Sequence, residues 1–184
     1  MNIRFLFLTF LTFLIVLTGC SKPITTSGLV PEYTSSYKFT DSTITVLPVV
    51  IRPQPKPGLV GPPHSMPGAN QYREAIVETL QRTGLFSEVK TTGDSNYLLS
   101  TEVIAERLIG DVNNIGLFLI RYELTDTSSD RVILSENIFS YSMLSGKDIY
   151  AGHERAPKVI ENSVRKNMTQ LTTRISEALQ SKNE

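Results

Sequence analysis

Residues 97–144, YLLSTEVIAERLIGDVNNIGLFLIRYELTDTSSDRVILSENIFSYSML, contain the pattern that decides the fold. Apolar and polar residues alternate with a period of two, which is typical of strands with one buried face. The two clearest sets are Leu99, Thr101, Val103 and Ala105, and then Phe118, Ile120, Tyr122 and Leu124. Turn-forming residues separate the runs at 110–114 and at 127–130. The stretch therefore predicts a three-stranded antiparallel meander with one face in water.

The third strand of this meander, Arg131 to Leu144, changes the parity of its apolar residues. Val132, Leu134 and Ile138 occupy even positions, whereas Phe139, Tyr141 and Met143 occupy odd ones. A β-bulge shifts the facing of a strand by one residue. We therefore expect a bulge between Ile138 and Phe139.

The residues before the meander predict a β-α-β unit. Residues 42–51 are rich in β-branched side chains and predict a strand, in which Pro48 marks a bulge or an edge. Residues 69–83 have apolar residues at helical spacing and are followed by Gly84, the residue type that ends helices in the left-handed conformation. Residues 86–91 predict a short second strand.

The C-terminal part predicts one long amphipathic helix from Pro157 to Gln180. Its apolar stripe consists of Ile160, Val164, Met168 (or Asn167), Leu171, Ile175 and Leu179. The expected order is β-α-β-β-β-β-α. We predict an α+β fold (an α/β sandwich), with a four- to five-stranded, mostly antiparallel sheet and two helices on one face.

The N-terminus has the pattern of an export signal. Phe5 to Leu17 is apolar except for two threonines, and such a length suits a signal-peptide core rather than a membrane span. The next residues, Leu17-Thr18-Gly19-Cys20, resemble the lipobox of bacterial lipoproteins. This resemblance implies cleavage before Cys20, a diacylglyceryl group on its sulfur and acylation of its new amino group. It also implies that Ser21, being other than Asp, directs export to the outer membrane.

These observations divide the chain into three parts. We expect a cleaved signal peptide at 1–19, a lipidated Cys20 with a flexible tether at 20–40, and one periplasmic α/β domain at 41–184. Cleavage removes nineteen of the 184 residues, Arg4 among them, and leaves 17 basic and 18 acidic side chains. This balance argues against a nucleic-acid partner. Attachment to a membrane would rest on the acyl chains.

Residues 53–67 contain six of the ten prolines and predict a long loop inside the domain. Such a loop is partly preordered as polyproline II, which suits partner binding, and the alternative is a surface insertion without a partner. The candidate partner-binding residues are Arg52, Pro53, Pro55, Lys56, Pro57, Pro62, Pro63 and His64. An exposed strand edge is a second candidate contact surface.

No motif predicts catalysis, a cofactor or a metal. Ser163-Val164-Arg165-Lys166 matches S-x-x-K, but it falls inside an amphipathic helix and lacks the companion triplets. The two histidines, His64 and His153, do not occur in an H-E-x-x-H motif, and the chain has a single cysteine. We expect a protein that is not an enzyme.

Residues 43–179 resemble a group of Gram-negative envelope lipoproteins. The resemblance is carried by the strand Ile44 to Ile51, Thr83-Gly84-Leu85-Phe86, Tyr97-Leu98-Leu99, Arg121-Tyr122-Glu123-Leu124 and the segment Glu161 to Asn167. These elements are similar to the α/β domains of ABC-transport auxiliary lipoproteins and of penicillin-binding-protein activator lipoproteins. The resemblance implies a non-catalytic accessory that docks on a larger envelope machine.

The sequence therefore predicts a lipid-anchored accessory module of the outer membrane, with its domain in the periplasm and an envelope protein as partner. Two alternatives stay open. A periplasmic hydrolase would need His64 or His153 near an acid and a nucleophile. A carrier of a lipid or hydrophobic ligand would need an apolar cavity of about 300 Å³ or more between sheet and helices.

Overall fold

The computed structural model describes residues 23–32, 39–53, 66–110, 114–145, 147 and 152–182. Three helices and six strands lie in this part of the chain. In chain order they are α2 (Thr26–Leu29), β1 (Phe39–Val46), β2 (Val50–Ile51), α3 (Ala69–Thr83), β3 (Phe86–Lys90), β4 (Tyr97–Ile109), β5 (Asn114–Asp126), β6 (Arg131–Leu144) and α4 (Gly152–Lys182).

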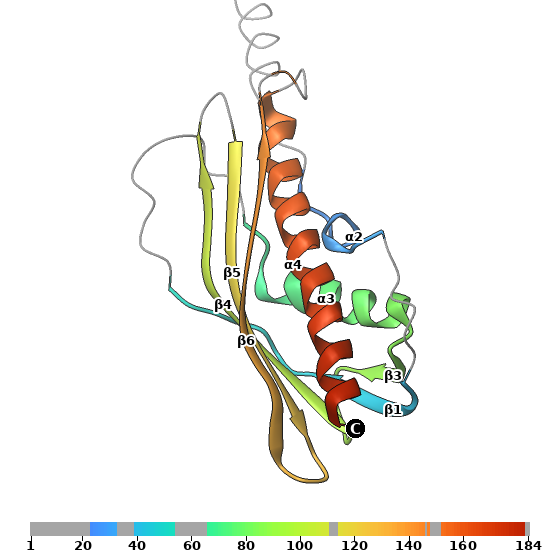
Figure 1. The fold of residues 1–184 in the computed structure, drawn as a ribbon. Helices are drawn as coiled ribbons and strands as arrows, with labels where there is room; N and C mark the ends of the chain where they lie inside the picture. Colours follow the sequence, from blue (N-terminus) through green and yellow to red (C-terminus); the bar gives the residue numbers. More distant parts are fainter. Residues whose placement is uncertain are drawn as a thin grey trace, which may run out of the picture.

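The strands form one open sheet in the order β3-β1-β4-β5-β6, with β2 also paired to β4. The three longest strands, β4, β5 and β6, form the predicted antiparallel meander. β1 pairs in parallel with both β3 and β4. Helices α3 and α4 cover one face of this sheet (Figure 1). The predicted α+β fold is confirmed.

The sheet has six strands because the first predicted strand is divided in two. β1 ends at Val46, opposite Leu99, and β2 begins at Val50, opposite Glu102. Pro48 lies in the interruption, where its missing N–H removes no ladder hydrogen bond. The predicted irregularity at Pro48 is confirmed.

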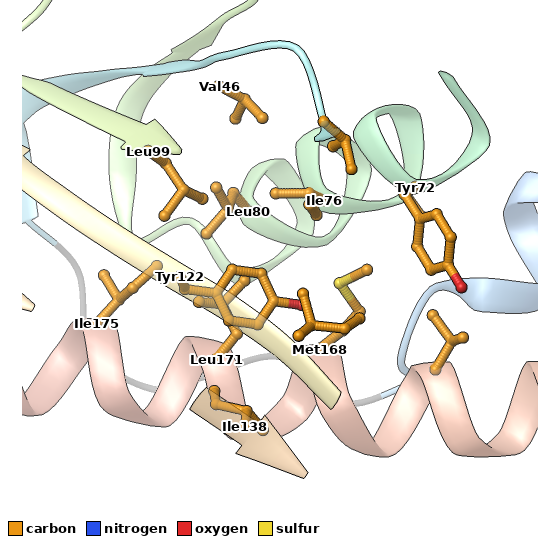
Figure 2. Packing of buried hydrophobic residues seen from close by; sticks show 14 of the residues in the cluster. Val46, Tyr72, Ile76, Leu80, Leu99, Tyr122, Ile138, Met168, Leu171 and Ile175 are labelled. Carbon is orange, nitrogen blue, oxygen red and sulfur yellow. The ribbon is translucent and has the colours of Figure 1, made fainter. Parts of the chain in front are cut away.

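The core fills the space between the sheet and the two helices. The buried stripe of α3 includes Tyr72, Ile76 and Leu80, and the buried stripe of α4 is the predicted one from Ile160 to Leu179. Figure 2 shows these side chains converging on Leu99 and Tyr122 of the sheet. Gly84 ends α3 in the left-handed conformation (φ 61°), and its N–H bonds the carbonyl of Gln81.

Helix α4 begins five residues before the predicted start. The helix runs from Gly152, so Pro157 lies in its second turn and not in its first. At this position the ring removes one backbone hydrogen bond, a loss that the helix tolerates near its end.

The prediction of a flexible tether up to residue 40 is wrong for residues 23–32. Ile24, Leu29 and Val30 are buried in the core. The Nε of Arg165 donates to the carbonyl of Gly28 (2.6 Å), and the Nε2 of Gln71 donates to the carbonyl of Ile24 (3.0 Å). Three apolar side chains within ten residues are enough to bind this segment to α3 and α4. We call residues 23–32 the strap.

Candidate docking face

The meander carries apolar side chains on the face that the helices leave uncovered. The predicted bulge between Ile138 and Phe139 does not exist, because Leu119 pairs with Phe139 and Ile120 pairs with Ile138 without a shift. The irregularity in β6 lies at Ile133 instead, near the turn. Phe139, Tyr141 and Met143 therefore point away from the core, and they are 54%, 57% and 58% exposed.

Small residues explain why β6 keeps its register here. The inward positions opposite α4 are occupied by Gly116, Ser140 and Ser142, so no large apolar side chain is needed to fill that side. A Cβ on Gly116 would lie 2.9 Å from the side chains of Val159 and Ser163, which shows how closely α4 approaches β5.

An irregularity in β4 adds side chains of this strand to the same exposed face. A register shift between Val103 and Ala105 turns Ala105, Arg107 and Ile109 outward, so the sequence-based grouping of Ala105 with Leu99 is wrong. The outward residues form three rows across β4, β5 and β6: Ala105-Leu119-Phe139, Arg107-Leu117-Tyr141 and Ile109-Ile115-Met143. We call these nine residues the apolar face, because eight of them are apolar. Monomeric proteins rarely expose a contiguous apolar patch of this kind without a function.

Two aromatic side chains of the apolar face lie side by side on β6, next to a lysine of α4. The rings of Phe139 and Tyr141 stack with centroids 6.2 Å apart. Lys166 of α4 places its Nζ 5.6 Å from the Tyr141 ring centroid and donates to the Tyr141 carbonyl (3.1 Å). Aromatic side chains such as these are enriched at protein–protein interfaces.

Nearer the β5–β6 turn the same side of the sheet is charged. Arg52 donates through both Nε and Nη2 to the carboxylate of Glu102, with 2.9 Å between Nη2 and Oε2. This bond holds the pKa of the Glu102 carboxyl below its usual value. Arg121 pairs with Glu123 at 2.8 Å. The charged half gives the apolar face a polar boundary.

The edge of β6, by contrast, is partly closed. The Nδ2 of Asn167 donates to the carbonyl of Ile138 (2.9 Å), and Lys166 binds the carbonyl of Tyr141. Side chains of α4 therefore occupy groups that a further strand would need. The apolar face has no such cover from α4, and it is the candidate contact surface of the meander.

Most predicted site residues lie outside the described residues. Cys20, Ser21, Pro55, Lys56, Pro57, Pro62, Pro63 and His64 belong to this group, as does the side chain of His153. Arg52 and Pro53 are exposed at the end of β2, where Arg52 binds Glu102. Ser163 is buried against the carbonyls of Gly116 and Val159 and serves the packing of α4, whereas Lys166 is exposed.

Two hollows lie at the surface of the part of the chain that the structure describes. One, of about 480 Å³, follows the outer side of α3 from Asn70 to Gln81. The other, of about 390 Å³, lies beside the β1–β2 interruption between Pro48 and Glu102. Among the described residues no group of His, Cys, Asp or Glu is arranged to hold a metal. No helix in the described ranges is long and apolar enough to span a membrane.

Comparison with known proteins identifies the fold. No protein-family model matches the sequence, and the search of curated proteins gave no match. Among solved structures, protein XCC0632 from Xanthomonas campestris (DUF330) matches with a TM-score of 0.61 and 16% identity, over 84% of this chain and 95% of its own. The hypothetical protein CT253 from Chlamydia trachomatis matches at 0.50 and 12%, over 73% and 98%. A minor lipoprotein from Acinetobacter baumannii matches at 0.45 and 10%, over 73% and 92%. At these identities the first two matches show a shared fold.

Proposed function

We propose that this protein is a lipid-anchored accessory module of the outer membrane, which binds an envelope protein through its apolar face in the periplasm. The observation that carries the proposal is the apolar face itself. Eight apolar side chains lie in one contiguous patch of a folded domain, on the side opposite the helices. Transport and cell-wall machinery are the partner classes that the sequence resemblance favours.

The composition of the face suits a protein partner. Large aromatic side chains surrounded by polar groups are the usual centre of a protein–protein interface. Phe139 and Tyr141 are the large aromatic side chains of the apolar face, and Lys166 and Arg107 supply positive charge beside it. A sheet face also gives a partner several rigid anchoring positions without ordering a loop.

The anchor rests on the sequence motif that ends at Cys20. Replacing Cys20 with Ala should abolish labelling by a palmitate analogue and leave an unprocessed precursor. Cys20 is the chain's single cysteine, so labelling that persists in the Cys20→Ala variant would contradict the anchor.

Binding of a partner at the apolar face is tested by photocrosslinking in intact cells. A photoreactive residue placed at Tyr141 should capture one reproducible envelope protein, whereas the same residue at Gln170, exposed on α4, should not. Adding Phe139→Ser should reduce the Tyr141 crosslink several-fold. A crosslink between two copies of this chain, or equal yields at Tyr141 and Gln170, would contradict the proposal.

A further inference from the structure

The strap is bound firmly to helices α3 and α4. Its apolar side chains Ile24, Leu29 and Val30 are buried, and its backbone accepts hydrogen bonds from α3 and α4. Thr26 also donates to Glu74 of α3 (3.0 Å), and Arg165 lies 3.7 Å from Glu32. Contacts at both ends and in the middle fix the strap on the domain.

The distance from the strap to the expected anchor is short. Cys20 precedes Ile24 by four residues. At about 3.6 Å per residue, four residues span at most about 14 Å. A free tether of twenty residues would instead allow about 70 Å. A lipid on Cys20 therefore keeps the strap next to the headgroups of the bilayer.

The strap and the apolar face lie on opposite sides of the sheet. The strap packs on α3 and α4, which cover the inner side, whereas the apolar face is on the outer side (Figure 1). A bilayer that meets the strap is thus kept away from the outer side of the sheet. The apolar face stays open to a protein that stands on the same membrane.

The β5–β6 turn lies at the end of the meander away from the strap (Figure 1). Arg165 of α4 contacts the strap, and Ser163, half a turn away, bonds the carbonyl of Gly116 in β5. From Gly116 to Asp126 the strand continues for ten residues, or about 34 Å at about 3.4 Å per residue. The turn therefore lies at the end of β5 away from the part of α4 that contacts the strap (Figure 1).

We infer that the strap is an orienting element, which holds the domain on the bilayer with the strap near the headgroups and the β5–β6 turn away from them. This inference rests on the proposed lipid anchor. It narrows the partner to a protein whose docking surface is presented close to the membrane surface. The strap then contributes to partner binding, because it holds the apolar face at a fixed distance from the membrane surface.

The inference is tested by energy transfer from the lipidated protein to vesicles of phosphatidylethanolamine and phosphatidylglycerol that carry an acceptor lipid. The sulfur of Cys20 is consumed by lipidation, so one introduced cysteine is the only free thiol. Donors are placed at Ser27→Cys in the strap or at Arg131→Cys beside the turn, both exposed positions. We expect at least two-fold more transfer from Ser27 than from Arg131. A donor at Asn70→Cys, exposed at the start of α3 near the strap, should behave like Ser27 and gives an independent reading.

The matched control inserts a twenty-residue Gly-Ser spacer between Lys22 and Pro23. The spacer should lower transfer from Ser27 and remove most of its difference from Arg131. Equal transfer from the two donors without the spacer, or transfer that the spacer leaves unchanged, would overturn the orienting role. Failure of the proposed function is read separately, as loss of the Tyr141 crosslink in cells or of acylation at Cys20.

Discussion

Asn167 shows how one polar residue organises the core of this domain. It interrupts the apolar stripe of α4 and is fully buried. Its Oδ1 accepts a hydrogen bond from the Tyr122 hydroxyl (2.8 Å), and its Nδ2 donates to the carbonyl of Ile138 and to the hydroxyl of Ser140. Burial raises the pKa of Tyr122 far above its usual value, so the phenol stays a donor. One side chain thus joins α4 to β5 and β6.

Replacing Asn167 with Leu should lower the free energy of unfolding by about 2–4 kcal/mol. The change leaves the Tyr122 hydroxyl and the Ile138 carbonyl buried without this partner, and each unsatisfied group costs about 1–3 kcal/mol. Urea unfolding measures the effect. Gln170→Leu, on the exposed side of the same helix, is the control and should change stability by less than about 0.5 kcal/mol. Equal stability of Asn167→Leu and wild type would contradict this account of the network.

At the scale of elements, the approach of α4 to β5 is set by Gly116. A Cβ at this position would lie 2.9 Å from the side chains of Val159 and Ser163 and 3.2 Å from the Val159 carbonyl. We therefore expect Gly116→Ala to destabilise the domain by about 1–3 kcal/mol, the usual cost of overpacking. Thermal unfolding checks this. Because part of the clash is with Val159, the double variant Gly116→Ala, Val159→Ala should be less destabilised than the sum of the two single variants. Strict additivity would refute the close contact.

The end of α4 is bound to the β5–β6 turn through Asp126. Its carboxylate accepts from Lys182 (2.8 Å) and from the side chains of Ser128 and Ser129. Lys182 also lies over the Tyr97 ring, 5.1 Å from its centroid. Through Lys182 first, and then the two serines, the pKa of Asp126 is held well below its usual range. An ion pair thereby joins the turn to the C-terminal end of α4.

This pair predicts a loss of stability in acid. A carboxyl group whose pKa is lower in the folded state than its unfolded value of about 4 stabilises the fold above pH 4, and the stabilisation is lost as the pH falls further. We expect the free energy of unfolding to fall between pH 4 and pH 2, and to fall less steeply in Asp126→Asn. Asp130→Asn is the matched control, since Asp130 is exposed in the same turn and Asn tolerates its positive φ. An Asp126→Asn profile parallel to wild type would contradict the pairing.

At the scale of the whole molecule, the two sides of the sheet have different roles. The inner side carries the core, whereas Phe139, Tyr141 and Met143 of the apolar face stay more than half exposed and contribute less to folding. Replacing Phe139, Tyr141 and Met143 together with Thr should therefore cost less than about 2 kcal/mol, much of it from the lost stacking of the two rings. Leu124→Ala in the core should cost about 2–5 kcal/mol. The same triple variant should lose the proposed crosslink to a partner, measured from a photoreactive residue at Leu117. A triple variant that fails to fold would contradict the division of roles.

The elements with strong periodicity could be predicted from the sequence. Phe118, Ile120, Tyr122 and Leu124 are all buried as their spacing predicts, and α3 has its predicted bounds with Gly84 at its end. The strap could not be predicted, because a segment of ten residues rich in Ser and Thr has no periodic signal. Leu29 and Val30 become buried only because α3 and α4 leave a place for them.

By itself the sequence determined the α+β class, the three-stranded meander, the helices α3 and α4 and the motif at Cys20, because period, turn residues and a short linear motif act locally. Only the tertiary structure decided which way Phe139, Tyr141 and Met143 face. Their alternation is equally consistent with burial after a bulge and with exposure without one. The close approach of α4, which Gly116, Ser140 and Ser142 permit, fills the inner side and leaves the aromatic residues outside. That choice depends on contacts between residues far apart in the chain, and it creates the apolar face.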